Sequence, residues 1–112
     1  MENLTVLFVS RHPGAREWAA EAGITVDVVI AHFDPETVQP GDVIIGTLPV
    51  NLAARVCERG GRYLHLSLEV PAEARGKELS AADLYECGAR LEEYQVLYMN
   101  DHDTESNLEF LK

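Results

Sequence analysis

The sequence predicts an α/β fold with a Rossmann-like, mostly parallel sheet and helices on both of its faces. Two short runs, 4–9 and 42–46, are almost wholly apolar, which is typical of strands that are buried on both faces. Segments with apolar residues at helical spacing alternate with these runs. Right-handed crossovers between such units produce a parallel sheet that is covered by helices on either side.

The expected strands are short and follow one another along the chain. Four of them are the runs 4–9, 25–30, 42–46 and 62–68. In the fourth run, alternation places the leucines on one face and His65 and Ser67 on the other. The last strand is expected at 94–99, which is rich in strand-forming residues, although 89–93 could extend a helix into it.

The expected helices are bounded by capping and turn residues. The first carries an apolar stripe that includes Trp18, the second opens at 47–49, and the third opens with a capping box of Ser80 and Asp83. Before the second helix, 34–36 is expected to cap a single helical turn. Each long helix is followed by a glycine, the residue best suited to the C′ position: Gly23, Gly60 and Gly88.

Length and charge limit the possible functions. The 112 residues include 19 Asp and Glu but only 9 Lys and Arg, which gives a net charge of −10. We expect one domain over 1–100, followed by an acidic tail at 101–112. A chain this acidic does not bind duplex nucleic acid or an anionic membrane through its overall field, so a phosphate ligand needs a local cluster of Arg, His and N–H groups.

The sequence also predicts a cytoplasmic protein. No apolar run approaches the roughly 20 residues of a membrane span. The first residues lack the pattern of a signal peptide, and two cysteines do not make a disulfide framework.

The first candidate site follows the first strand, because ligands of such sheets bind beyond the carboxyl ends of the strands. Arg11 supplies a permanent planar cation suited to phosphate, and His12 is a residue type that exchanges a proton near neutral pH. Gly14 would let a ligand approach a helix N-terminus, whose N–H groups favour an anion. Ser10, Arg11 and His12 are therefore candidate catalytic residues, and Gly14 is a candidate ligand contact. Alternatively, Ser10 or His12 only caps the helix and Arg11 is a solvated cation.

Two further segments are expected at the same edge of the sheet. The segment after the third strand offers Gly46, Thr47, Leu48, Pro49 and Asn51 as candidate ligand contacts. Thr47 and Asn51 can donate hydrogen bonds to a phosphate or a base edge, but Thr47 could instead be the N-cap while Gly46 only permits the turn. The end of the fourth strand offers His65 and Ser67, although a satisfied core histidine is the commoner outcome.

Several other chemistries are disfavoured by residue spacing. Cys57 and Arg62 do not have the spacing of a phosphatase loop, and Cys57 is interpreted as a core residue. The histidines and cysteines show no paired metal-ligand spacing, and neither a glycine-rich dinucleotide fingerprint nor a P-loop follows a strand, so we expect no metal and no cofactor. The connection 70–79 is interpreted as an ordinary exposed loop, the alternative being a lid from which Arg75 and Lys77 reach phosphates.

Four strings in this order resemble a small CRISPR-associated family: SRHPGA, GTLPVNLAARVCERG, RYLHLSLEVPAEARGKELSAADL and CGARLEEY. It is the Csx-type accessory family numbered sixteen, which is found beside type III CRISPR loci. The resemblance covers roughly residues 5–95 and is much more specific than any single motif above. The acidic extension after Asn100 lies outside it.

This resemblance implies a small relative of the CARF (CRISPR-associated Rossmann) domains that acts on cyclic oligoadenylate, the second messenger of type III systems. It implies a homodimeric, metal-independent ring nuclease with cyclic tetra-adenylate as the expected ring. In that reaction a ribose 2′-OH attacks its own 3′-phosphate. Arg11 and helix N–H groups would stabilise charge on the phosphate oxygens, and His12 would be the general acid or base.

Two other classes of protein are alternatives to a ring nuclease. A binding protein that sequesters cyclic oligoadenylate without cutting it would use the same loops. An interaction protein that docks on the CRISPR effector through its acidic surface would fit the net charge of −10.

Overall fold

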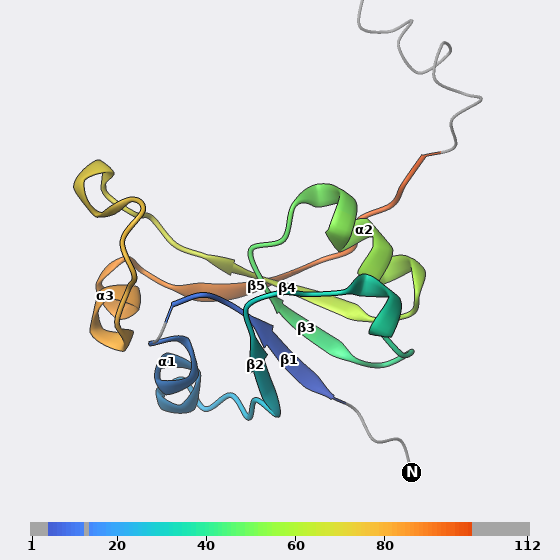
Figure 1. Ribbon diagram of the computed structural model, residues 1–112, viewed down its shortest axis with the longest axis horizontal. Coiled ribbons are helices and arrows are strands. Elements are labelled where there is room, and N and C mark those ends of the chain that lie inside the picture. The colour runs from blue at the N-terminus through green and yellow to red at the C-terminus, as the bar shows by residue number, and fades with distance from the viewer. Residues whose placement is uncertain (1–4, 13, 100–112) are drawn as a thin grey trace, which may run out of the picture.

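The computed structural model describes residues 5–12 and 14–99, and it confirms the predicted α/β fold. Five strands form one sheet in the order β2-β1-β3-β4-β5 (Figure 1). The first four strands in the chain are parallel, and β5 is antiparallel to β4. The strands are β1 (Val6–Val9), β2 (Val28–Ile30), β3 (Val43–Gly46), β4 (Arg62–Ser67) and β5 (Arg90–Tyr94). The helices are α1 (Ala15–Glu21), α2 (Val50–Glu58) and α3 (Ala81–Glu86), with the short 3₁₀ turns η1 (Pro35–Thr37) and η2 (Ala72–Ala74). The expected acidic tail lies outside the described residues.

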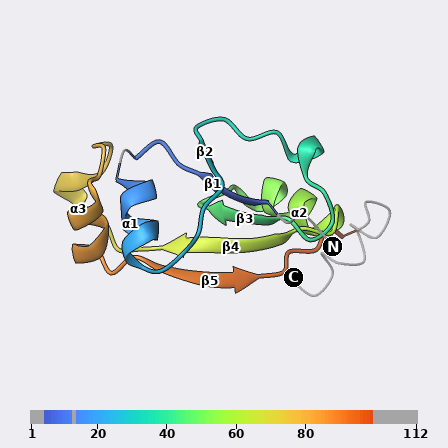
Figure 2. The ribbon, with the colours of Figure 1, turned by 90° about the horizontal axis from the view of Figure 1, so that it is seen from below.

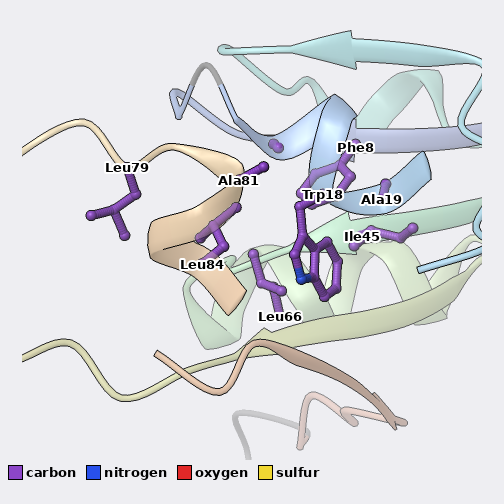
Figure 3. Close-up of a cluster of buried hydrophobic side chains, with 9 residues drawn as sticks. Phe8, Trp18, Ala19, Ile45, Leu66, Leu79, Ala81 and Leu84 are labelled. Carbon is purple, nitrogen blue, oxygen red and sulfur yellow. The ribbon is translucent and has the colours of Figure 1, made fainter. Parts of the chain in front are cut away.

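Helices cover both faces of the sheet, which explains the continuous apolar runs. The consecutive residues Ile44 and Ile45 of β3 are both buried, and each belongs to a different hydrophobic cluster. One cluster joins the sheet to α1 and α3 through Trp18 and Leu84 (Figure 3). The other joins it to α2 through Val56. A strand between two such layers needs apolar side chains in both directions.

Helices α1 and α3 lie side by side at one end of the molecule, away from α2 (Figures 1 and 2). Gly14 permits this contact, because a Cβ atom there would lie 2.1 Å from the backbone nitrogen of Ala81. The N–H of Gly14 donates to the carbonyl of Leu79 at 3.2 Å. The predicted capping box then starts α3: Ser80 Oγ accepts from the N–H of Asp83, whose carboxylate accepts from the N–H of Ser80. None of the helices in the described ranges is long and apolar enough to cross a membrane.

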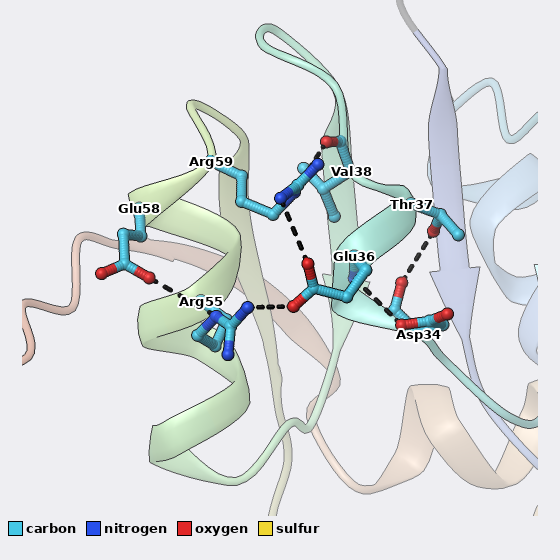
Figure 4. Close-up of polar contacts among 7 residues, drawn as sticks. All are labelled: Asp34, Glu36, Thr37, Val38, Arg55, Glu58 and Arg59. Atoms are coloured by element: carbon cyan, nitrogen blue, oxygen red, sulfur yellow. Dashed lines mark hydrogen bonds and ion pairs between the residues drawn. The ribbon is translucent and has the colours of Figure 1, made fainter.

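A polar network connects η1 to α2 on the other face (Figure 4). Asp34 caps η1, as predicted, by accepting the N–H of Glu36 at 3.0 Å. The Glu36 carboxylate pairs with Arg55 of α2 and with Arg59, the C-cap of α2, and Arg59 also donates to the carbonyl of Val38 at 3.1 Å. The long connection from β2 to β3 is therefore anchored on α2.

Two strand predictions need correction. The last strand is the polar stretch that precedes 94–99, and 94–99 itself forms no strand beyond its first residue. At this exposed edge β5 pairs with β4 from Tyr63–Tyr94 to Ser67–Arg90, and polar side chains also meet across the two strands, since Arg62 donates two hydrogen bonds of 2.9 and 2.8 Å to the Glu93 carboxylate. Beyond β5 the chain turns to α2, where the N–H of Val96 donates to Cys57 Sγ at 3.4 Å.

The second strand is also shorter than predicted. It includes only the second half of 25–30, since the pairing with β1 begins at Val28. The preceding Asp27 still donates its backbone N–H to the carbonyl of Val6 at 2.9 Å, while its carboxylate accepts the N–H of Val6 at 2.8 Å. The acceptor for the N–H of Val6 is therefore a side chain rather than a backbone carbonyl of the ladder.

Candidate functional site

The strand order creates a crevice at the carboxyl ends of β1 and β3. From β1 the chain passes through α1 to β2 on one side, and then returns past β1 to β3 on the other. Crossovers that leave in opposite directions separate at this point, which is where open α/β sheets bind ligands. A cavity of about 520 Å³ lies there, within the size range of small-molecule sites. It is lined by residues 9–12, 31–33 and 47–49, with Leu52, Leu66 and Leu68.

The cavity brings together all three predicted segments and one that was not predicted, and the end of β4 contributes Leu66 and Leu68 rather than His65 and Ser67. Ser10, Arg11 and His12 face it together with Thr47, Leu48 and Pro49. The missed segment contributes His32 and Phe33 from the end of β2. Because β2 is parallel to β1, its carboxyl end lies at the same edge, so the strand-end rule could have identified these residues.

Positive charge in this cavity is local. Arg11 is exposed and makes no hydrogen bond or ion pair with any described residue. His12 and His32 line the same cavity, and no acidic side chain is among its described lining residues. A protein of net charge −10 therefore presents an anion-compatible surface at this crevice.

His12 is held by a contact far along the chain. Its Nδ1 atom accepts a hydrogen bond of 3.2 Å from the backbone N–H of Leu79. An accepting Nδ1 carries no proton, so the neutral ring has its proton on Nε2 and offers an N–H donor there. Ser10 supports the same turn, since its Oγ accepts the N–H of His12 at 3.0 Å and its own N–H donates to Ile30 at 2.9 Å.

The N-terminus of α1 is less available to a ligand than the sequence analysis expected. The N–H of Gly14 donates to Leu79, and the N–H of Ala15 donates to the carbonyl of His12 at 3.1 Å. The space beside Gly14 is filled by the backbone of Ser80 and Ala81. The expected approach of a ligand to Gly14 is therefore replaced by close packing of α1 on α3.

In the segment that follows β3, Thr47 is exposed at the cavity, whereas Leu48 is held by a hydrogen bond to Tyr63. Helix α2 has Pro49 as its N-cap with no side-chain cap, so Thr47 is not the N-cap and remains exposed at the cavity. The N–H of Leu48 donates to Tyr63 Oη at 2.9 Å, and this hydroxyl also contacts the carbonyl of Gly46 at 3.1 Å. Burial raises the pKa of the Tyr63 phenol, so the hydroxyl stays protonated while it supports the turn between Gly46 and Leu48. Asn51 is exposed and does not line the cavity.

Gly46 is buried between two strands rather than open to a ligand. A Cβ atom at this position would lie 2.9 Å from the carbonyl oxygen of Val9. The glycine lets the end of β3 approach β1 closely, directly beneath the cavity.

His65 and Ser67 are on the opposite side of β4 from the cavity-lining leucines. His65 Nδ1 lies 2.7 Å from Tyr63 Oη, and its ring packs edge-on against Tyr63 and Tyr94. Ser67 donates a short hydrogen bond to the Glu92 carboxylate, which lowers the pKa of Glu92. Neither side chain lines the cavity, and His65 is a half-buried histidine whose Nδ1 has a partner in Tyr63.

Metal ligands do not gather at this site. Within residues 5–12 and 14–99, no group of three His, Cys, Asp or Glu side chains is placed to hold a metal ion.

Comparison with known proteins identifies a family. A family model described as "Putative CRISPR-associated protein (Cas_VVA1548)" matches residues 7–97, which include every residue that lines the cavity. No curated protein and no solved structure matches the chain. The match extends over most of the 112 residues, from β1 to just beyond β5. The chain therefore belongs to this family of CRISPR-associated proteins.

Proposed function

We propose that this CRISPR-associated protein is a ring nuclease that binds cyclic oligoadenylate and cleaves it without a metal ion, with cyclic tetra-adenylate as the preferred ring. The observation that carries the proposal is the cavity at the β1–β3 crevice, where Arg11, His12 and His32 meet no acidic side chain among the described lining residues. Phe33 and Leu52 supply apolar surface in the same cavity, suited to an adenine ring.

The proposed reaction is an internal transesterification. A ribose 2′-oxygen forms a bond to the adjacent phosphorus, the bond from phosphorus to the 5′-oxygen breaks, and the product ends in a 2′,3′-cyclic phosphate. The proton of the 2′-OH passes to water, and the 5′-oxygen takes a proton from water. The protein's contribution is to hold the attacking and leaving oxygens in line and to stabilise charge on the phosphate.

Arg11 and His12 have different parts in this reaction. Arg11 is a cation without an ion-pair partner among the described residues, and it binds the phosphate oxygens through its planar guanidinium. His12 donates its Nε2–H to the same phosphate, because Leu79 occupies its Nδ1 atom. This makes His12 a hydrogen-bond donor to developing charge rather than a general base.

A homodimer is the proposed assembly. A ring of four equal nucleotides contains a two-fold axis, so two copies of the chain would present the same loops to opposite halves of the ring. Each copy then places one Arg11 and one His12 beside a phosphate, although only one cleavage is needed to open the ring.

The test is a direct incubation of the purified protein with excess cyclic tetra-adenylate in EDTA, with the products resolved by chromatography and mass detection. We expect linear products that end in a 2′,3′-cyclic phosphate. Cyclic hexa-adenylate in a parallel reaction measures the ring preference. A ring that stays intact and remains free in a protein-depleted filtrate would overturn the proposal.

A non-catalytic binding protein is the second candidate, and one contact favours it. Because His12 Nδ1 already accepts from Leu79, its neutral imidazole offers a donor but no free basic nitrogen to the cavity. A ring that stays intact but is removed from the filtrate would identify this protein as a binder that sequesters the messenger.

A further inference from the structure

A second cavity of about 360 Å³ adjoins the first. The two share His12 and Leu68 as lining residues, so the imidazole lies at the boundary between them. The far side of the second cavity is formed by the segment that joins β4 to α3, through Arg75, Gly76 and Lys77. Figure 1 shows this segment extending beyond the end of β4, at the same end of the molecule as α1 and α3.

The charges of this second cavity are also unneutralised. The side chains of Arg75 and Lys77 form no hydrogen bond or ion pair with any residue in the described ranges. Glu73 and Glu78 are close to them in sequence, but neither lines the cavity. Four arginines elsewhere in the chain pair with glutamates: Arg55, Arg59, Arg62 and Arg90. The two cations are thus available to an anion at a boundary that His12 shares.

The segment is anchored to the first cavity rather than hinged away from it. The N–H of Leu79 donates to His12 Nδ1, and its carbonyl accepts the N–H of Gly14 at 3.2 Å. Within the segment, the backbone N–H of Arg75 donates to the Ala72 carbonyl and closes η2, and the backbone N–H of Lys77 donates to the Ala74 carbonyl in the next turn, both at 3.3 Å. The second cavity therefore has a fixed relation to Arg11 and His12.

We propose that the two cavities form one cleft that binds an oligonucleotide at two phosphates: the reacting phosphate at Arg11 and His12, and a second phosphate of the same ligand at Arg75 and Lys77. This inference rests on the proposed function and names a part of the ligand that does not react. The second phosphate contact positions the ring, because a contact far from the reacting bond contributes to binding and orientation.

The test measures affinity separately from cleavage. The probe is cyclic tetra-adenylate with a 2′-O-methyl group on every ribose, which keeps the phosphates but lacks the attacking hydroxyl. Arg75→Ala with Lys77→Ala is compared with the charge-keeping pair Arg75→Lys with Lys77→Arg. Arg16→Ala is the matched control, since Arg16 is exposed, has no ion-pair partner among the described residues and lines neither cavity.

The alanine pair is expected to raise Kd for this probe roughly ten- to hundredfold, as expected for lost charge-assisted contacts. The slope of log affinity against log salt should become shallower by about 0.7, which corresponds to one phosphate contact on a single strand. The single-turnover rate on saturating unmodified ring should stay within about threefold of wild type, because the reacting phosphate keeps Arg11 and His12. The charge-keeping pair and Arg16→Ala should both bind like the wild type.

The outcomes separate this inference from the function on which it rests. A wild-type protein that binds and cuts the ring, together with an alanine pair of unchanged Kd, would overturn the second phosphate site alone. A wild-type protein that binds no ring would overturn both. An alanine pair that loses cleavage at saturation but keeps its Kd would place these cations in the chemistry and contradict the positioning role.

Discussion

Arg11 differs from most arginines of this acidic chain because it is left without a carboxylate partner among the described residues. We expect Arg11→Ala to slow ring cleavage by roughly 10²- to 10³-fold, the usual cost of removing one preorganised group that stabilises transition-state charge. The measurement is the single-turnover rate in EDTA. Arg16→Ala controls for the loss of one positive charge and should keep the wild-type rate. Cleavage by Arg11→Ala at the wild-type rate would mean that the reacting phosphate lies elsewhere.

The tautomer of His12 leads to a second prediction. A glutamine at this position can still donate an N–H from the end of its side chain, but it cannot transfer a proton at neutral pH. We expect His12→Gln to retain cleavage within about tenfold of wild type, whereas His12→Ala should lose about 10²- to 10³-fold. If both variants lose activity equally, His12 moves a proton and the donor role is wrong.

Part of this site could be predicted from the positions of polar residues after the expected strands. Arg11, His12 and Thr47 were indicated because each follows an apolar strand of a parallel sheet. For His65 the sequence left both outcomes open, since alternation separates the two faces of β4 but does not say which face borders the cavity. That depends on where the crossovers leave the sheet.

At the scale of elements, the contact between α1 and α3 determines how His12 is held. Gly14→Ala places a methyl group 2.1 Å from the backbone nitrogen of Ala81, so α3 must move. We expect a loss of about 1–3 kcal/mol in the free energy of unfolding, as for other overpacked sites. Cleavage should also fall, because the N–H that holds His12 belongs to Leu79, two residues before Ala81.

The control for this substitution is Gly23→Ala. Gly23 has a positive φ of 81° and no atom within 4 Å of an added Cβ, so its cost comes from the backbone conformation alone. Chemical denaturation measures both variants. Equal stability losses, with cleavage unaffected in both, would show that α3 does not position the site.

The capping box of α3 predicts a pH dependence. Hydrogen bonds from the backbone N–H and the hydroxyl of Ser80 lower the pKa of Asp83 in the folded state. Its contribution to stability is therefore complete above the ordinary Asp pKa of about 3.9 and is lost as pH falls through the lower folded-state value. Asp83→Asn removes the titration, so wild type should have the higher Tm at neutral pH, and this difference should vanish between about pH 5 and pH 2. A difference that persists at the acid end would assign the stabilisation to something other than the carboxylate.

Local sequence signals predicted most elements but not their long-range partners. The capping box, the turn at Asp34 and the apolar stripe of α1 are contained within a few neighbouring residues, and each is confirmed. The hydrogen bond between Leu79 and His12 joins positions 67 residues apart, and no local pattern indicates it. The prediction of the last strand at 94–99 was wrong for the same reason. Its position is defined by pairing between β5 and β4, which the composition of the segment alone does not indicate.

At the scale of the whole molecule, the site is a small positive region in a strongly negative protein. Residues 101–112 contain four acids and one lysine, so they carry three of the ten net negative charges. A protein truncated after Asn100 should therefore bind the anionic ring faster at low salt, since its overall field is less repulsive. At about 300 mM salt, where the Debye length is well below about 8 Å, the two association rates should converge.

Stopped-flow association of a fluorescent ring at two salt concentrations measures this effect. The match to the CRISPR-associated family ends at residue 97, so the truncated chain keeps the whole matched range. If the truncated protein fails to bind the ring at either salt concentration, then residues 101–112 contribute to binding, by contact with the ring or with the second copy of the chain in the proposed homodimer.

Leu79 has one further consequence, which concerns the continuity of the chain. Its N–H and its carbonyl are both bonded to the segment 12–14, while the residues just before it are largely exposed. A break near Gly76 would leave β1 to β4 and every lining residue of the first cavity in one fragment, and Lys77, Leu79, α3 and β5 in the other. We expect the two pieces to reassemble through the α1–α3 contact and the β4–β5 ladder, since exposed loops are the sites where chains tolerate a cut. Under the proposed function, we expect the separate pieces to be inactive, because His12 then lacks the N–H of Leu79, and we expect mixing to restore cleavage.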